Sequence, residues 1–487
     1  MVSCIAKIEL ENLTYTIPGG FNAASYSARL DLWELPRAQS FKGLWRWWLR
    51  ALLSGALWEG GKYDLNKVRQ ATESILGSIN QASKFIIRVS AKGKAKPISV
   101  DAIERWKRER RQLTIAPNEL LGWLPPSPRI PPIPPRLFLL LQTGGSNEQL
   151  AEKISNYQPG NLQITMELLE RPFTSPSSEE CSVALSSLLL SLIFGGIGAI
   201  TRRGFGSLSF IQVKISEEYQ VYYEDLVNNI IKTNDPSKVY NLLCQLIRRS
   251  LSSAQELLGV RGVASPNKVP DYLLLSEPGD PPLKDVRPFN LSVICLSVPS
   301  VTDSEKRAFQ LFGFKDYEAM KLLTIIGYST TKLFWKLIDR KISRTPGYPW
   351  ETWIMGLPRG QKIDKQKLQV PYLEVDLYED GNHIGSKRWN TLKTGYSLDG
   401  EGSRRTSAIS IKPIKRLERN SWIIALYGFL SKDWYDVLYH YGVTPPPKPG
   451  KKDHRYRVEK QKLEPSKDVS RAFVEAWISL KKIYGVR

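Results

Sequence analysis

The sequence predicts an α+β fold in which helices cover one face of an antiparallel sheet. The chain has 487 residues and is 42% hydrophobic, which is enough apolar surface for ordinary cores in two domains. Its first 215 residues give the order strand, helix, two strands, helix, strand. This is the βαββαβ arrangement, not the regular alternation of a doubly wound fold. The second half again mixes helices with strands and could be a degenerate copy of the same unit.

Hydrophobic periodicity, together with glycine and proline at the ends of segments, gives the expected elements of the first half. The opening strand covers residues 5–17, where apolar and polar side chains alternate, and it stops at Gly19 and Gly20. A proline-rich, extended connector covers residues 125–135. The other expected strands cover residues 85–90, 137–141, 162–169 and 207–215. The expected helices cover residues 41–58, 65–82, 102–113, 148–156 and 181–194.

The second half begins with two helices and ends with an amphipathic helix. Its expected helices cover residues 217–232, 237–259, 303–312, 316–326, 330–341 and 466–484. Its expected strands cover residues 272–275, 291–298, 372–378, 407–415 and 422–429. The change from the final strand of the first half to helices predicts an N-terminal domain of residues 1–216 and a C-terminal domain of residues 217–487.

The net charge of +21 predicts a polyanionic partner, most simply nucleic acid. A membrane-surface protein would need an amphipathic anchor, and every amphipathic segment here is better explained as core; acidic protein partners are a third option. The four cysteines lie far apart, with no CxxC pair and no Cys/His cluster, so we expect no zinc and no other cofactor. The N-terminus has no signal peptide, and the apolar run at residues 183–200 contains three serines. These features predict a cytoplasmic protein.

The first motif that carries chemistry is FKGLWRWWLR at residues 41–50. Lys42, Arg46 and Arg50 are spaced by four residues, so on a helix they form one cationic stripe. Trp45 lies near the border between this stripe and the apolar face. The stripe suits a phosphate backbone, and the aromatic side chains could stack on bases. The alternative is a solvated cationic face above core tryptophans.

The second motif is a glycine-rich segment, GGIGAITRRGFGS, at residues 195–207. Its glycines allow positive φ and a close approach of the backbone to a ligand, while Thr201, Arg202 and Arg203 supply donors. It is neither a P-loop nor a dinucleotide fingerprint, because no Gly-Lys-Ser/Thr follows and because it joins a helix to a strand. The segment suits an RNA backbone, and Phe205 could stack on a base or pack beneath the loop. The alternative is a flexible turn with solvated arginines.

These two motifs, together with RRTSAISIKP at residues 404–413, resemble the RAMP superfamily of CRISPR-associated proteins. Within it, the tryptophan-rich motif is similar to the first-numbered subunit of the Cmr (type III-B) effector complex. The resemblance implies two tandem ferredoxin-like (RRM-like) domains with helical insertions. It also implies an antiviral, non-catalytic subunit that holds the guide RNA's 3′ region and the guide–target duplex, with CRISPR RNA, target single-stranded RNA and other Cmr subunits as partners. The RNA-contact candidates are Lys42, Trp45, Arg46, Arg50, Thr201, Arg202, Arg203, Phe205, Arg404 and Arg405.

Two other functions stay open. Some RAMP relatives are metal-independent endoribonucleases that process precursor CRISPR RNA with a histidine as general acid or base. The histidines of this chain, His383, His440 and His454, lie far from both motifs in sequence. A protein-only assembly adaptor is the third function. Four carboxylates could hold magnesium, but an exposed strand face with a turn explains them more simply; they are Glu374, Asp376, Glu379 and Asp380.

Overall fold

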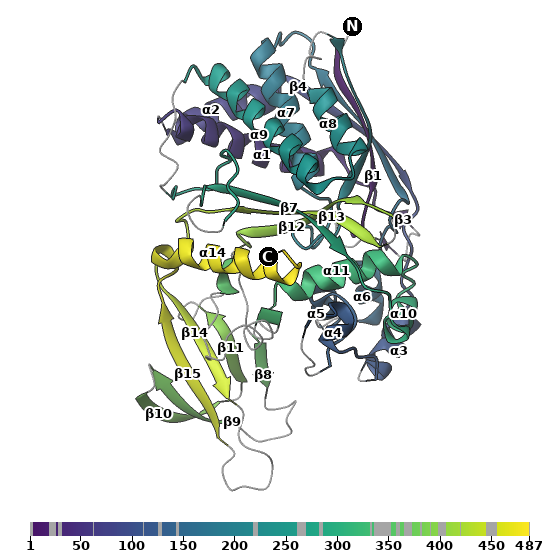
Figure 1. Cartoon of the computed structure of the whole chain (residues 1–487), viewed down its shortest axis with the longest axis vertical. Helices are drawn as coiled ribbons and strands as arrows, with labels where there is room; N and C mark the ends of the chain where they lie inside the picture. Colours follow the sequence, from purple (N-terminus) through teal and green to yellow (C-terminus); the bar gives the residue numbers. More distant parts are fainter. Residues whose placement is uncertain are drawn as a thin grey trace.

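A computed structural model of the chain gives its architecture (Figure 1). It describes residues 3–486 apart from 19–25, 28–31, 62, 111, 125–128, 143–145, 218–222, 261–268, 282–285, 332–333, 336–351, 357–360, 365–372, 380–381, 390, 398–405, 419 and 445–454.

The first sheet contains β1 (Cys4–Asn12), β4 (Phe85–Gly93), β5 (Leu162–Glu170) and β6 (Leu208–Ile215). Its order is β4-β5-β1-β6, and all three neighbouring pairs are antiparallel. Along the chain, helices α1 (Ala38–Glu59) and α2 (Leu65–Leu76) come after β1 and before β4, and α7 (Ser178–Phe194) comes between β5 and β6. The predicted βαββαβ order and the α+β class are therefore confirmed, and the strand order is consistent with a ferredoxin-like unit.

The second sheet contains β7 (Phe289–Ser297), β12 (Ile409–Arg416) and β13 (Ser421–Phe429). Its order is β12-β13-β7, with antiparallel neighbours, which repeats the arrangement of β4-β5-β1 in the first sheet. Helices α10 (Asp303–Leu311) and α11 (Tyr317–Ser329) follow β7, and α14 (Pro465–Ile483) closes the chain. Among the described residues, this sheet has no equivalent of β6.

The second sheet is a central layer, because both of its faces are buried. On β13, Ile423, Ala425 and Phe429 pack into the core that contains α1 and α7, whereas Trp422 and Ile424 pack into the core that contains α11 and α14. Figure 1 shows β7, β13 and β12 between these two groups of helices. Burial on both sides explains why β13 is an almost continuous apolar run.

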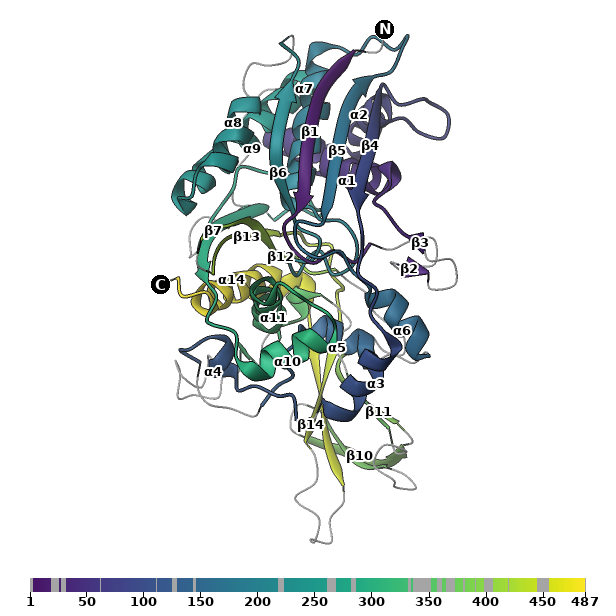
Figure 2. The same cartoon turned by 90° about the vertical axis from the view of Figure 1, so that its right-hand side faces the viewer.

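Each of the two hydrophobic cores contains residues from both sides of residue 216. Helices α8 (Tyr223–Lys232) and α9 (Pro236–Leu258) pack into the core of the first sheet. Conversely, α3 (Val100–Glu109) and α6 (Asn147–Ile154) pack into the core of the second half, where Figure 2 shows α3 between α6 and α10. The division at residues 216 and 217 stays a prediction, and neither core keeps to one side of it.

A third sheet extends beyond α14 at the end of the molecule opposite the N-terminus (Figure 1). Its order is β10-β9-β15-β14-β11-β8, and the β15–β9 pair is parallel. The strands are β8 (Gln361–Asp364), β9 (Leu373–Glu379), β10 (Asn382–Trp389), β11 (Thr391–Ser397), β14 (Leu438–Thr444) and β15 (Tyr456–Leu463). Its own buried cluster consists of Leu373, Val375 and Val458, so this sheet has little core.

Two predicted strands are wrong. Residues 137–141 belong to α5 (Pro135–Gln142), in which Leu137 and Leu141 are buried and Leu139 is half exposed. A short apolar run does not distinguish a strand from a helix that packs along one side. Residues 272–275 form no ladder: residue 272 lies in a bend and residues 273–275 are irregular. The remaining short elements are β2 (Tyr26–Ser27), β3 (Leu32–Trp33), α4 (Pro117–Leu120) and the 3₁₀ turn η2 (Thr352–Met355).

The predicted helix at residues 330–341 lies mostly outside the described residues. The apolar run beginning at residue 183 belongs to α7, which is buried on nearly all sides, and its three serines bind backbone carbonyls one turn earlier. Among the described residues, no helix is long and apolar enough to cross a membrane.

Candidate nucleic-acid interface

The three motifs meet at one pocket of about 180 Å³. Helix α1 contributes Leu44, Trp47 and Trp48. The glycine-rich segment contributes Gly195, Gly196, Thr201 and Arg202, and the second sheet contributes residues 406–408, Ser410, Tyr427 and Phe429. The pocket therefore lies between the first sheet's helices and the second sheet, at the start of β12.

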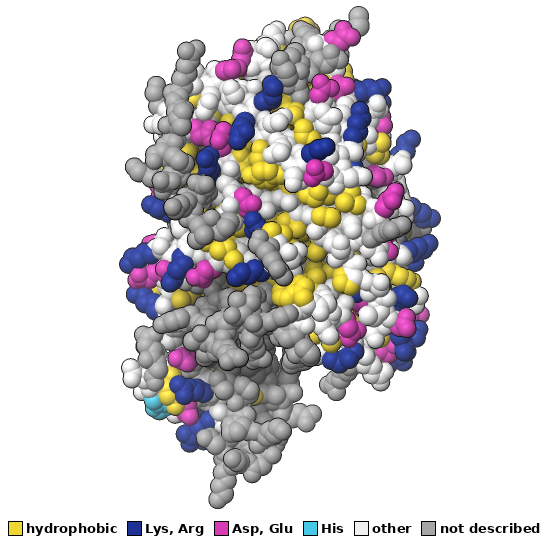
Figure 3. Space-filling model, in the orientation of Figure 1, with side chains coloured by type: hydrophobic (Ala, Val, Ile, Leu, Met, Phe, Trp, Pro, Cys, Tyr) yellow, Lys and Arg dark blue, Asp and Glu magenta, His cyan; other side chains and the backbone are white. Residues whose placement is uncertain are grey.

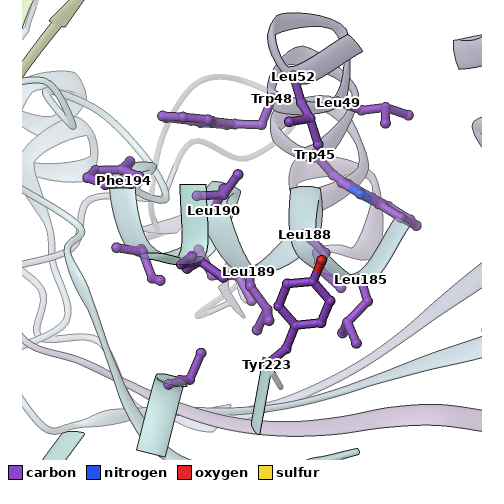
Figure 4. Close-up of a cluster of buried hydrophobic side chains, with 14 of the residues drawn as sticks. Trp45, Trp48, Leu49, Leu52, Leu185, Leu188, Leu189, Leu190, Phe194 and Tyr223 are labelled. Carbon is purple, nitrogen blue, oxygen red and sulfur yellow. The ribbon is translucent and has the colours of Figure 1, made fainter. Parts of the chain in front are cut away.

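The tryptophans of α1 have different environments. Trp45 is fully buried, and its Nε1 donates to Ala184 O at 3.1 Å and to Ser187 Oγ at 2.8 Å. Figure 4 shows Trp45 and Trp48 in the apolar cluster that α1 shares with α7. The assignment of Trp45 to RNA contact is therefore wrong, because a ring held inside the core cannot stack on a base.

Trp47, like Trp45, was expected near the border of the cationic stripe, but it was not among the predicted RNA-contact residues. Its ring is half-buried, lines the pocket and meets the ring of Phe429 edge to face at 5.2 Å. On a helical wheel, Leu44, Trp47 and Trp48 lie next to one another on the side away from Lys42, so their spacing could have indicated the face of α1 that lines the pocket.

The three cations of the stripe on α1 do not all have the same role. The Arg46 guanidinium donates to Leu76 O at 2.9 Å and Gly77 O at 3.0 Å, so it caps the C-terminal end of α2. Arg50 is exposed and Lys42 is half-buried, and neither bonds to another described residue. Burial lowers the pKa of Lys42, and Arg171 and Arg46 lower it further. Lys42 and Arg50 are thus the members of the stripe that are placed to meet phosphates.

The arginines of the glycine-rich segment hold the two halves of the chain together. Arg203 is buried, and its guanidinium donates to Met355 O at 2.9 Å and to Ile409 O at 3.3 Å. Arg202 donates to Ser407 O at 2.6 Å and also lines the pocket. The assignment of Arg203 to RNA contact is corrected, because its donors point at backbone carbonyls of the second half.

Phe205 is also a core residue. Its side chain is 1% exposed and packs with the core of the second half, so its assignment as a stacking residue is wrong. Thr201 and Arg202 remain RNA-contact predictions at the pocket. Arg404 and Arg405 lie outside the described residues, immediately before Thr406 in the pocket lining.

The glycines of this segment serve its own tight folding. Gly198 has φ 88° and Gly206 has φ 61°. A Cβ at Gly206 would lie 1.9 Å from Ile197 O, and one at Gly198 would lie 2.3 Å from Ile17 O. The close approach that we expected toward a ligand is therefore made toward the chain's own backbone.

Two side chains of the second sheet reach the C-terminal end of α7. The Lys412 ammonium donates to Gly195 O, and the Tyr427 hydroxyl donates to Phe194 O at 2.5 Å. Burial lowers the pKa of Lys412 to about 7. Both contacts satisfy helix carbonyls that would otherwise lack partners, and they fix one wall of the pocket.

Lys412 should make stability depend on pH. Between about pH 7 and 10.5 the unfolded chain binds a proton at this lysine that the folded chain does not, so the free energy of unfolding should rise with pH. Urea denaturation of wild type and Lys412→Met from pH 7 to 9.5 measures this slope. The variant should show a flatter slope, and Lys238→Met on the exposed surface of α9 should match the wild type. If the free energies of unfolding of wild type and Lys412→Met differ by the same amount at every pH in this range, the prediction is wrong.

The histidines and carboxylates lie away from this pocket. His383 is exposed in the β9–β10 hairpin, with Nε2 at 3.9 Å from Asp376 Oδ1. His440 is buried on β14 against Tyr396, and His454 lies outside the described residues. Each described carboxylate of the predicted cluster lies within 4 Å of a basic side chain. Glu374 is paired with Arg388 and Arg455. Asp376 is paired with Arg455 and His383, and Glu379 is paired with Lys460. Asp380 lies outside the described residues.

No group of three or more metal-ligating side chains occurs in the part of the chain that the structure describes. The net charge is also spread out: on the face in Figure 3, Lys and Arg alternate with Asp and Glu. Local clusters such as the α1 stripe therefore matter more for recognition than the total charge.

Comparison with known proteins gives three kinds of match. Residues 37–209 match the RAMP superfamily. The CRISPR system CMR subunit Cmr1 of Saccharolobus solfataricus is 23% identical over 282 residues, which cover 48% of this chain and 60% of that protein. The matched region is thus less than two thirds of that relative's length.

Solved structures of similar shape include Cmr1 from Pyrococcus furiosus in its apo form, with 16% identity, 92% of each chain covered and a TM-score of 0.43. They also include chains of two type III-B Cmr-beta structures, each covering 88% of this chain and 94% of the other. One is bound to cognate target RNA and AMPPnP in the presence of ssDNA, with 18% identity and a TM-score of 0.44. The other is bound to cognate target RNA, with 16% identity and a TM-score of 0.47. The resemblance inferred from the motifs is confirmed: the chain carries a RAMP superfamily segment over residues 37–209 and resembles Cmr1.

Proposed function

We propose that this chain is a non-catalytic, CRISPR RNA-binding subunit of a type III-B (Cmr) effector complex in the cytoplasm. It would hold the guide RNA's 3′ region and the guide–target duplex, beside other Cmr subunits. The observation that carries the proposal is the convergence of the three motifs at one pocket, to which α1, the helix that carries the cations Lys42 and Arg50, contributes Trp47. The similarity to Cmr1 supports the choice of complex.

The chemistry of the pocket supports RNA as the ligand. Trp47 offers part of an aromatic face, and Thr201 and Arg202 offer donors. At about 180 Å³ the pocket is smaller than most enclosed ligand sites, so it suits one inserted base or sugar with the phosphates outside. Lys42 and Arg50 lie on the same helix as Trp47 but on another side of it, so they would bind phosphates farther along the strand than the inserted nucleotide.

The lining of the pocket also supports a non-catalytic role. Among the described residues that line it, the titratable side chains are Arg202 and Tyr427. Burial raises the pKa of Tyr427, whose hydroxyl already donates to Phe194 O. A hydroxyl with a raised pKa that is already engaged in a hydrogen bond is poorly suited to act as a general base near neutral pH.

The variant Lys42→Ala/Arg50→Ala should weaken binding of a labelled single-stranded RNA about tenfold at 0.1 M salt. The plot of log K against log salt should become shallower by about 1.4, because each lost phosphate contact removes about 0.7. The measurement is a fluorescence anisotropy titration across a salt series. The matched control is Lys238→Ala/Arg136→Ala, which removes one exposed lysine and one exposed arginine from α9 and α5.

Product gels on the same samples separate the alternatives. Intact RNA with reduced affinity of the variant supports the scaffold function. Reproducible cleavage by wild type that is lost in His383→Ala would establish the endoribonuclease instead. Unchanged affinity and unchanged salt slope in the variant would favour the protein-only adaptor.

A further inference from the structure

The turn after β5 exposes a phenylalanine completely. Phe173 is 105% exposed relative to a reference chain, and its backbone has φ 65°. The left-handed region is unfavourable for a bulky L-residue. The side chain therefore gains nothing from burial and sits on an unfavourable backbone conformation. Such an outlier calls for a partner outside the chain.

The turn is held in place by hydrogen bonds. Arg171 N donates to Lys84 O at 2.7 Å, and Arg171 Nε donates to Ser83 O at 2.6 Å. The Thr174 hydroxyl bonds to Arg171 O at 2.7 Å and to Lys84 O at 3.3 Å. Phe173 is thus held out by an ordered backbone, so little conformational entropy would be lost when its ring is covered.

Cations surround the turn. The ladder pairs Phe85 of β4 with Glu170 of β5, so the loop entering β4 and the turn leaving β5 share one end of the sheet (Figure 2). Arg171 interacts electrostatically with Lys42 of the α1 stripe. Lys84 is neutralised by Glu180 at 2.6 Å, which leaves Arg171 and Lys42 as the local positive charges.

We propose that Phe173 stacks on a base of single-stranded RNA while Arg171 and Lys42 bind the flanking phosphates. The inference rests on the proposed function and adds a second contact point, at the end of the first sheet that carries this turn. One protruding ring flanked by cations suits insertion between bases. A protein or membrane partner would instead be met by a contiguous apolar patch.

The test measures RNA affinity and salt slope for three variants of the full chain. Phe173→Gly should raise the dissociation constant about five- to a hundred-fold without changing the salt slope, since it removes stacking but no phosphate contact. Phe173→Tyr should bind like wild type. Arg171→Ala should make the salt slope shallower. Leu139→Ala, an exposed apolar change on α5, is the control and should leave binding unchanged.

Folding provides an independent readout. Phe173→Gly should raise the melting temperature or leave it unchanged, because glycine accepts φ 65°. Loss of affinity in a variant that folds at least as well supports stacking. Photocrosslinking of 4-thiouridine RNA should map to residues 171–174 in wild type.

The outcomes separate this inference from the proposed function. If Phe173→Gly binds like wild type while Lys42→Ala/Arg50→Ala loses affinity, stacking at this turn is wrong and RNA binding stands. If both variants bind like wild type, both proposals fail. Unchanged RNA affinity of Phe173→Gly with lost assembly into the complex would identify a protein contact and also overturn stacking.

Discussion

Replacing Arg203 with methionine is expected to lower the free energy of unfolding by about 3 kcal/mol. The buried guanidinium bonds to Met355 O and Ile409 O from the second half, and to Arg202 O beside it. Methionine would fill part of the volume but remove these three hydrogen bonds, although Ile409 O keeps the Ser407 hydroxyl as a donor and Arg202 O keeps Ile411 N. Urea denaturation followed by tryptophan fluorescence measures the loss.

The same change should also weaken the proposed RNA contacts of the pocket, although the Arg203 guanidinium bonds to backbone carbonyls. Its loss removes one of the contacts between the glycine-rich segment and the second half, so Thr201 and Arg202 should be held less firmly, although Lys412 and the backbone bridge between residues 203 and 411 remain. Arg203→Lys is the matched control: it keeps the charge but cannot span the same carbonyls, so an intermediate loss is expected. Wild-type stability in Arg203→Met would show that the guanidinium does not join the halves.

Replacing Lys321 with methionine should cost about 3–5 kcal/mol of unfolding free energy. Lys321 and Glu305 are both fully buried, with Nζ and Oε2 2.9 Å apart. The ammonium also donates to Glu119 O at 2.9 Å and Ser300 O at 2.7 Å, so it joins α11 to α10 and α4. The variant would leave a buried carboxylate without its counter-ion.

A double variant identifies the unpaired charge as the cause. Lys321→Met/Glu305→Gln removes the carboxylate while glutamine can keep the cap on Thr302 N. It should therefore be more stable than Lys321→Met alone, as a double-mutant cycle at pH 7 would measure. If the two losses simply add, the pair contributes no coupling and the explanation fails.

The sequence predicted the first sheet well because its information is local. β1 and β5 alternate apolar with polar side chains, and glycine or a helix cap follows nearby. In the third sheet, the sequence predicted one strand, at residues 372–378, which corresponds to β9. The strands β8, β10, β11, β14 and β15 were not predicted. Among the described side chains, that sheet has a buried cluster of its own of three residues, so its strands carry little apolar pattern, and their order depends on pairings far apart in sequence.

The sequence predicted which segments form the candidate site, but not what each of their side chains does there. Spacing placed Lys42, Arg46 and Arg50 on one face, but it could not show that carbonyls at the end of α2 occupy Arg46. Arg203 likewise bonds to carbonyls 152 and 206 residues away along the chain. Backbone acceptors have no sequence signature, so a buried structural arginine and a phosphate-binding arginine look alike until the fold is known.

The interlocked cores impose an order on synthesis. The ribosome completes the first sheet at Ile215, but the core beneath its helices also needs Tyr427 and Phe429. At about 5–20 residues per second, the nascent chain waits roughly 10–40 s between these points. Throughout that interval the apolar surfaces of α1 and α7 lack their final cover. We therefore expect chains in which the second sheet has not yet been made, including fragments truncated before it, to be prone to aggregation.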